Sequence, residues 1–141
     1  MTEHPLRAVI DAYNQAWNRH DIDAILAMHT DDSVFENHTS GGTAVGHDAI
    51  RKLVSGVFET FPDLRFSLRR MYARDDLVVQ EWTATATHAN PVKYKDGILG
   101  PTGRTIQWDG MDIFPMRNGK IARKDVYASS LDYLRQLGAP V

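Results

Sequence analysis

Two aspartates in the C-terminal half lie on segments with the alternating pattern of β-strands, and their carboxyl groups could do acid/base chemistry. Asp112 belongs to the run WDGMDIF (108–114), and Asp125 belongs to RKDVY (123–127). A carboxyl group that a strand points into the interior is costly unless it is paired, protonated or used in function. The sequence therefore predicts a pocket lined by carboxyl groups.

Two predicted strands supply candidate walls for this pocket. One face of the strand over residues 77–88 carries Val78, Gln80, Trp82, Ala84, Ala86 and His88. Small side chains beside an indole suit a cavity wall with room for a ligand, although Ala84 and Ala86 could instead accommodate a packing helix. On the strand over residues 104–116, alternation places Asp112 on one face and Asp109 on the opposite, solvated face. Asp112 shares its face with Ile106, Trp108, Gly110 and Phe114.

The histidines offer a second source of proton transfer. A histidine near a carboxylate titrates close to neutrality, so His88 is a candidate base. The alternative is a histidine at the rim that binds the loop over residues 89–103, which contains two prolines and three glycines. We interpret His20, His29 and His47 as surface or capping residues. No H-x-H or H-x-x-x-H spacing occurs, and no metal site is predicted.

The elements that must position these residues follow from a change of periodicity along the chain. Helical spacing predicts helices over residues 5–18, 21–28, 47–60 and 131–137, and alternation predicts strands over 33–37, 65–73, 77–88, 104–116 and 120–127. Residues 39–46 are predicted to form a flexible loop. Helices followed by a meander of strands predict an α+β fold with helices on one face of an antiparallel sheet. If that sheet curls, its concave face and the helices enclose a cavity.

Composition excludes several classes of function. The chain of 141 residues is expected to form one domain over 1–141. The absence of cysteine excludes disulfides and thiolate metal sites, and it suits a cytoplasmic protein. A net charge of -2 gives no basis for a nucleic-acid partner. We expect neither a signal peptide nor a membrane span, because long apolar runs are missing.

Several motifs resemble those of the NTF2-like superfamily, particularly its SnoaL-like polyketide cyclase and ketosteroid isomerase branches. The run YNQAWNRHDIDAILAMHTDDSVFEN (13–37) is similar to the opening of the superfamily, and GHDAIRKLV is similar to the entry of its third helix. GPTGR, WDGMDIF, GKI and YLRQLG resemble SnoaL-like closing motifs in order and spacing. The resemblance covers nearly the whole chain. It implies a cone-shaped α+β barrel, with a curved mixed sheet around N-terminal helices and a deep, mostly apolar pocket.

The resemblance to the isomerase branch implies an oxyanion-binding pair. Tyr13 and a protonated Asp112 match positions that donate hydrogen bonds to a developing oxyanion in that branch. The alternatives are a core aromatic for Tyr13, and an ion pair with Arg104 or Arg123 for Asp112. The general base of the isomerases falls on Asn37, whose amide cannot take a proton from carbon at neutral pH.

Other branches of the superfamily are also matched in part. Asn37-His38 resembles the N-H pair of SnoaL-like cyclases, but Ser129 stands where those cyclases carry an acid/base aspartate. Asp125 resembles an aspartate of limonene epoxide hydrolases, with KDVY in place of their RDY. Those hydrolases also need an Arg-x-Asp pair, where this chain has Trp82 and Ala84.

The sequence and the resemblance together predict a cofactor-independent enzyme that acts on a mid-sized apolar carbonyl compound. Tyr13 and Asp112 would stabilise an enolate during isomerisation or aldol-type cyclisation, and Asp125 or His88 would move the proton. The residues expected to bind a small apolar or polycyclic ligand are Trp17, Asn37, His38, Trp82, Trp108 and Tyr127. The resemblance also implies a homodimer. Two alternatives stay open: a non-catalytic ligand-binding or dimerising module, and an epoxide hydrolase or hydroxylation-type role that uses Asp125 with Tyr127.

Overall fold

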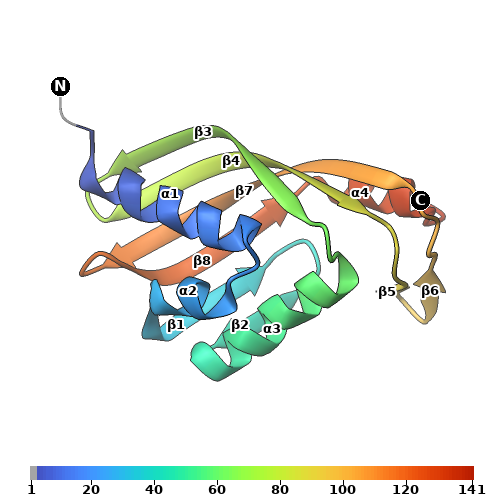
Figure 1. Ribbon diagram of the computed structural model, residues 1–141, viewed down its shortest axis with the longest axis horizontal. Coiled ribbons are helices and arrows are strands. Elements are labelled where there is room, and N and C mark those ends of the chain that lie inside the picture. Colours follow the sequence, from blue (N-terminus) through green and yellow to red (C-terminus); the bar gives the residue numbers. More distant parts are fainter. Residues whose placement is uncertain (1–2) are drawn as a thin grey trace.

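The computed structural model describes residues 3–141, and its helices lie against one long curved sheet (Figure 1). The elements in chain order are α1 (Pro5–Asn18), α2 (Ile22–Ala27), β1 (His29–Asn37), β2 (Gly42–Val45), α3 (His47–Thr60), β3 (Arg65–Arg74), β4 (Leu77–Thr87), β5 (Val92–Tyr94), β6 (Gly97–Leu99), β7 (Thr105–Arg117), β8 (Lys120–Ala128) and α4 (Ser130–Leu137). In the described part of the chain, no helix is long and apolar enough to cross a membrane.

The main sheet is mixed and does not close into a complete barrel. Its strand order is β2-β1-β8-β7-β4-β3, in which β1 and β8 are parallel and the other neighbours are antiparallel. The strands β3, β4 and β7 run along one another and bend together (Figure 1). The predicted α+β class with a curved mixed sheet is confirmed.

The helices cover the concave side of this sheet at two places. Helix α1 packs against β3 and β4, whereas α3 packs against β1 and β2. Proline at the first position of α1 suits a helix start, because its missing N–H would have no partner there. The interior face of α1 includes Ile10, Tyr13 and Trp17, which are buried. The two helices therefore leave a space between them over the middle of the sheet.

Three local features differ from the predicted elements. Strand β1 begins at His29 rather than at residue 33, and the predicted loop over 39–46 contains β2, which pairs with β1. The loop over 89–103 folds back on itself as the β5–β6 hairpin. Both missed strands of the hairpin have three residues, too few to show an alternating pattern.

A β-bulge in β8 decides which side chains face the interior. Against β7, Asp125 pairs with Ile113 and Ile121 pairs with Met116, so β8 has one residue more than β7 between these pairs. An extra residue reverses the alternation of faces along the bulged strand. Ile121 and Lys124 consequently both point inward, although they lie three positions apart.

Candidate active site

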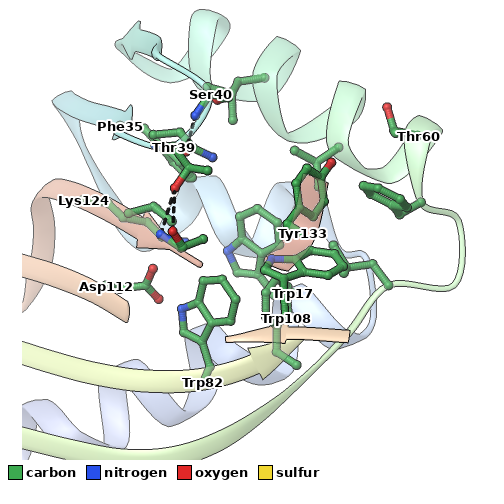
Figure 2. Close-up of a pocket in the computed structure, with 18 of the residues that line it drawn as sticks. Trp17, Phe35, Thr39, Ser40, Thr60, Trp82, Trp108, Asp112, Lys124 and Tyr133 are labelled. Atoms are coloured by element: carbon green, nitrogen blue, oxygen red, sulfur yellow. Dashed lines mark hydrogen bonds between the residues drawn. The ribbon is translucent and has the colours of Figure 1, made fainter. Parts of the chain in front are cut away.

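A cavity of about 470 Å³ lies between the helices and the concave face of the sheet. Its size falls within the range of about 300 to 1,000 Å³ typical of small-molecule sites. Seven aromatic residues line it: Trp17, Phe35, Phe61, Phe66, Trp82, Trp108 and Tyr133. In Figure 2, Trp17, Trp82, Trp108 and Tyr133 lie on one side of two polar groups, Asp112 and Lys124.

Asp112 is held at the cavity wall by a chain of amide side chains. It is 3% exposed, and its cross-strand neighbour on β4 is Gln80. Gln80 Nε2 donates to Asp112 Oδ2 at 2.9 Å and to Asn14 Oδ1 at 2.9 Å. Asn14 Nδ2 in turn donates to Gln80 Oε1 at 2.7 Å. Helix α1 and two strands thus fix the direction of the carboxyl group.

Lys124 is a buried lysine whose amine faces the same cavity. The residue is 5% exposed, and Nζ donates to Tyr13 Oη at 3.3 Å. The rings nearest to Nζ, with centroid distances of 4.4, 4.6, 4.9 and 5.7 Å, belong to Trp17, Phe35, Tyr13 and Phe114. Burial lowers the pKa of Lys124, and the charge of Asp112 raises it in part.

Behind Lys124, a buried hydrogen-bond chain leads away from the cavity. Tyr13 Oη lies 2.9 Å from His29 Nε2, and His29 Nδ1 lies 2.9 Å from Ser33 Oγ. Because Tyr13 Oη accepts from Lys124, its own hydrogen is free to donate to Nε2, and Nδ1–H then donates to Ser33. Burial lowers the pKa of His29 to about 3, so the ring is neutral at pH 7. Burial also raises the pKa of Tyr13 well above its ordinary range.

Two buried polar atoms at this cavity have no hydrogen-bond partner within the described part of the protein. They are Asp112 Oδ1 and Trp17 Nε1, an acceptor and a donor, and both residues line the cavity. A buried polar group without a partner costs roughly 1–3 kcal/mol, so such groups are uncommon in folded proteins. Asp112 Oδ1 lacks a donor and Trp17 Nε1 lacks an acceptor, and a ligand hydroxyl group can act as either.

The two charged residues do not neutralise each other directly. Among the ion pairs of residues 3–141, none joins Lys124 to Asp112. Both side chains instead point into the space that a ligand would occupy (Figure 2). The pair can therefore present a proton acceptor and a positive donor to one bound molecule.

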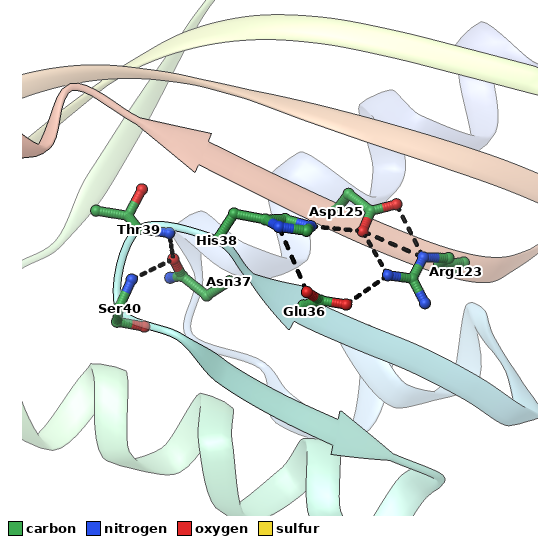
Figure 3. Close-up of polar contacts among 7 residues, drawn as sticks. All are labelled: Glu36, Asn37, His38, Thr39, Ser40, Arg123 and Asp125. Atoms are coloured by element: carbon green, nitrogen blue, oxygen red, sulfur yellow. Dashed lines mark hydrogen bonds and ion pairs between the residues drawn. The ribbon is translucent and has the colours of Figure 1, made fainter.

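Asp125 does not line this cavity, and its predicted place beside Asp112 is wrong. The bulge in β8 turns it to the opposite face of the sheet, where Arg123 donates from Nε to Asp125 Oδ2 at 2.9 Å. His38 Nε2 lies 2.8 Å from Asp125 Oδ1, and Arg123 also donates to Glu36 at 2.6 Å. Figure 3 shows this cluster along β1 and β8. Hydrogen bonds from Arg123 hold the pKa of Asp125 below its usual range.

Two predicted ligand-binding residues belong to this outer cluster. The ring of His38 stacks on that of Tyr127 at 4.2 Å, and neither residue lines the cavity. Glu36, His38 and Asp125 offer oxygen and nitrogen atoms within 4.8 Å of one another, the spacing of a metal site. The guanidinium of Arg123 already supplies the positive charge there, so this cluster is explained without a metal ion.

His88 is also outside the cavity, contrary to its predicted role as a base facing the ligand. Its ring is fully buried, with Nε2 3.1 Å from Leu99 O and Nδ1 2.9 Å from Thr102 Oγ1. Since a carbonyl only accepts, Nε2 carries the hydrogen and Nδ1 accepts from the threonine. A Cβ at Gly100 would lie 2.1 Å from the ring. His88 therefore anchors the loop that follows β4, which was the alternative interpretation.

The remaining predicted residues divide between the cavity surface and the layer behind it. Trp17, Asn37, Trp82 and Trp108 line the cavity, as does Asp112. Tyr13 is fully buried and reaches the cavity only through Lys124. The Oδ1 atom of Asn37 accepts from Thr39 N at 2.9 Å and from Ser40 N at 3.1 Å, which ties its carbonyl to a turn.

Sequence reasoning missed Lys124 and gave no role to Asn14 or Gln80. Alternation had placed Gln80 on the correct face of its strand. Lys124 lies two positions before Val126 on β8, and both side chains are buried. Each face of the predicted strand over residues 120–127 carries two charged residues, so the pattern did not separate Lys124 from Asp125. The interpretation of His29 as a surface residue is wrong, since the ring is 1% exposed.

Comparisons with known proteins agree with this architecture. The model of the SnoaL-like domain family matches residues 10–124. No curated protein sequence matches the chain. AclR from Streptomyces galilaeus, provisionally described as a hydroxylase, is 26% identical with a TM-score of 0.79, over 94% of this chain and 84% of that chain.

Two further solved structures share the fold at lower identity. TerC, co-crystallised with polyporic acid, is 21% identical with a TM-score of 0.80, over 96% of this chain and 100% of that chain. IdmH from Streptomyces antibioticus, provisionally described as a polyketide cyclase, is 19% identical with a TM-score of 0.80. The match covers 96% of this chain and 100% of that chain. Each of these proteins folds as this chain does over nearly its whole length.

Proposed function

We propose that this chain, which belongs to the SnoaL-like domain family, is an enzyme that performs acid/base chemistry on a mid-sized apolar carbonyl compound. The reaction would be an isomerisation or an aldol-type cyclisation that passes through an enolate. The observation that carries the proposal is the unpaired Oδ1 of Asp112, buried at an aromatic cavity beside the amine of Lys124. The fold of IdmH and the co-crystallisation of TerC with polyporic acid are consistent with a ligand of this kind.

In this mechanism Asp112 is the proton acceptor. Its Oδ1 takes the proton from the carbon next to the carbonyl group, and the electrons of that C–H bond form the C=C bond of the enolate. The hydrogen bond from Gln80 to Oδ2 keeps the carboxylate oriented without occupying the reacting oxygen. A positioned base of this type contributes roughly 10²–10⁴-fold to the rate.

The developing negative charge on the ligand oxygen would be stabilised by Lys124 and Trp17. The ammonium group and the free indole Nε1–H are donors at the cavity, and hydrogen bonds to an oxyanion are stronger where water is excluded. This assignment replaces the expected pair of Tyr13 and Asp112. It also gives Asp112 the proton-carrying role that was expected of Asp125 or His88.

Deuterium exchange tests the assignment directly. We expect the protein to accelerate exchange at the acidic carbon of 2-tetralone in D₂O, measured by proton NMR. Asp112→Asn should lower the exchange rate by roughly 10²–10⁴-fold, because the amide cannot accept the proton. Asp125→Asn is the matched control, since Asp125 lies on the other face of the sheet, and it should exchange at the wild-type rate. Equal rates in wild type and Asp112→Asn would refute the mechanism.

A non-catalytic ligand-binding module is the second candidate, favoured by the amide at Asn37 and by Ser129 at the start of α4. All three tryptophans of the chain line the cavity, so quenching of their fluorescence reports ligand entry. Quenching by equilenin-like phenols without any catalysed exchange would favour this candidate. An epoxide hydrolase role is disfavoured because Asp125 is engaged by Arg123 outside the cavity.

A further inference from the structure

We propose that Lys124 is also a nucleophile, which forms a covalent iminium adduct with aldehydes and reactive ketones in the cavity. The proposal rests on the proposed function only in taking a carbonyl compound as the ligand. It adds a covalent step at a residue that the acid/base mechanism uses solely as a positive charge.

The surroundings of Lys124 differ from those of every other lysine in the chain. The remaining four are exposed: Lys52, Lys93, Lys95 and Lys120. Lys124 alone is buried, and within residues 3–141 its Nζ has a single hydrogen-bond partner, Tyr13 Oη at 3.3 Å. Because Lys124 also lines the cavity, the positions on Nζ that Tyr13 does not use are open to a ligand, and a carbonyl carbon could approach the amine there.

Burial changes the chemistry of the amine as well as its position. Desolvation disfavours the ammonium form and lowers the pKa of Lys124, so the neutral, nucleophilic amine is more populated than in an exposed lysine. Two influences oppose this effect, the charge of Asp112 and the four aromatic rings around Nζ. His29 is neutral at pH 7, so it adds no second positive charge beside the amine.

Asp112 is placed to handle the protons of the covalent step. The lone pair of Nζ attacks the carbonyl carbon and forms the C–N bond, while the C=O π electrons move to oxygen, which takes up a proton. The nitrogen loses a proton to the Asp112 carboxylate, and Asp112 returns this proton to the carbinolamine hydroxyl, which leaves as water. The other proton on that oxygen comes from solvent. The C=N bond of the iminium then forms. The balance is amine plus carbonyl plus one proton giving iminium plus water, and no oxidant or reductant is required.

The same carboxylate could then act on the adduct. An iminium makes the adjacent C–H more acidic than the parent ketone does, because its nitrogen already carries a positive charge. Transfer of that proton to Asp112 Oδ1 would give an enamine, the nitrogen equivalent of the enolate. The unpaired Oδ1 is the atom available for this transfer, since Oδ2 accepts from Gln80.

Reductive trapping tests the proposal. The full-length protein is incubated with 2-naphthaldehyde and sodium cyanoborohydride at pH 7, then analysed by intact mass and by peptide mapping. Cyanoborohydride reduces an iminium to a secondary amine, so the expected product carries the mass of the aldehyde less one oxygen atom. We expect Lys124 to be modified faster than the four exposed lysines, and trypsin to stop cleaving after residue 124.

Three variants make the result specific. Lys124→Arg keeps the positive charge but cannot form an iminium, and it should lose the adduct at residue 124 entirely. Lys120→Met removes an exposed lysine of the same strand and should be trapped as the wild type is. Asp112→Asn should still be trapped, but more slowly. Slower or equal labelling of Lys124 relative to the exposed lysines would overturn the proposal.

The outcomes also separate this proposal from the proposed function. If wild type shows no adduct at Lys124 while Asp112→Asn loses exchange, the covalent step fails and the enolate mechanism stands. If trapping at Lys124 occurs but exchange is independent of Asp112, the lysine is a nucleophile and the assignment of the base is wrong. Exchange at the wild-type rate in Lys124→Arg would likewise exclude the iminium as an intermediate of that reaction.

Discussion

Asp112 and Lys124 are charged residues that face an aromatic cavity instead of each other, and this arrangement is unfavourable for folding alone. Moving a charged group out of water costs several kcal/mol, a cost that a close ion pair offsets only in part. Here Lys124 has one neutral hydrogen-bond partner and Asp112 Oδ1 has none within residues 3–141. Such unsatisfied groups are expected at sites where a ligand supplies the missing partners.

Removing both charges should therefore stabilise the protein while abolishing its activity. We expect the double variant Lys124→Met/Asp112→Asn to unfold at a higher denaturant concentration, with a gain of about 1–4 kcal/mol, by analogy with replaced buried ion pairs. Asn at position 112 keeps an oxygen for Gln80 Nε2, so the amide chain to Asn14 is preserved. Equilibrium urea unfolding measures the change. A loss of stability in this variant would mean that the two charges support the fold.

At the scale of the elements, strand regularity decided what the sequence could predict. The β4–β7 pairing runs from Leu77–Pro115 to Thr87–Thr105 without a shift, so simple alternation correctly placed Gln80, Trp82 and Asp112 on the interior face. In β8 a single extra residue reversed the faces. Neither glycine nor proline marks this bulge in the run IARK, and the sequence alone gave no sign that Lys124 would point inward.

The β4–β7 pair also depends on a close contact that a small substitution would break. Gly110 lies opposite Trp82, and a Cβ at this position would be 2.3 Å from the indole ring. Gly110→Ala should push the ring into the cavity and destabilise the protein by about 1–3 kcal/mol, the usual cost of overpacking. Urea unfolding, followed by tryptophan fluorescence, measures the loss.

The matched control for this prediction is a glycine that lines the cavity. Gly56 lies within α3, and a Cβ there would meet nothing within 4 Å. Alanine in a helix interior is favoured over glycine by roughly 0.5–1 kcal/mol, so Gly56→Ala should stabilise the protein. We expect Gly110→Ala to lower the free energy of unfolding and Gly56→Ala to raise it. Equal effects would show that Trp82 can move without cost.

At the scale of the whole molecule, helices and sheet enclose a cavity whose polar groups come from both layers. Asn14 and Tyr13 belong to α1, whereas Gln80, Asp112 and Lys124 belong to the sheet. Periodicity and resemblance predicted this α+β arrangement, because it depends on many residues at once. The contacts within the cavity depend on single registers and could not be predicted in the same way. The homodimer expected from the resemblance stays a prediction.

Folding of the whole chain should become less favourable in mild acid because of His29, which links α1 to β1. Its pKa is about 3 in the folded protein and 6.5 as a free side chain, so below pH 6.5 the unfolded chain binds a proton that the folded protein refuses. The free energy of unfolding therefore decreases as the pH decreases. His29 accounts for a loss of roughly 2 kcal/mol between pH 7.5 and pH 5. The aspartates whose pKa is lowered in the folded protein, including Asp125, reduce stability only as the pH approaches about 3.9, the ordinary pKa of an aspartate. Urea unfolding at several pH values should show this dependence of stability on pH in the wild type and a weaker one in His29→Gln. The amide of that variant can still accept from Tyr13 and donate to Ser33. The same pH dependence in both proteins would exclude His29 as the cause.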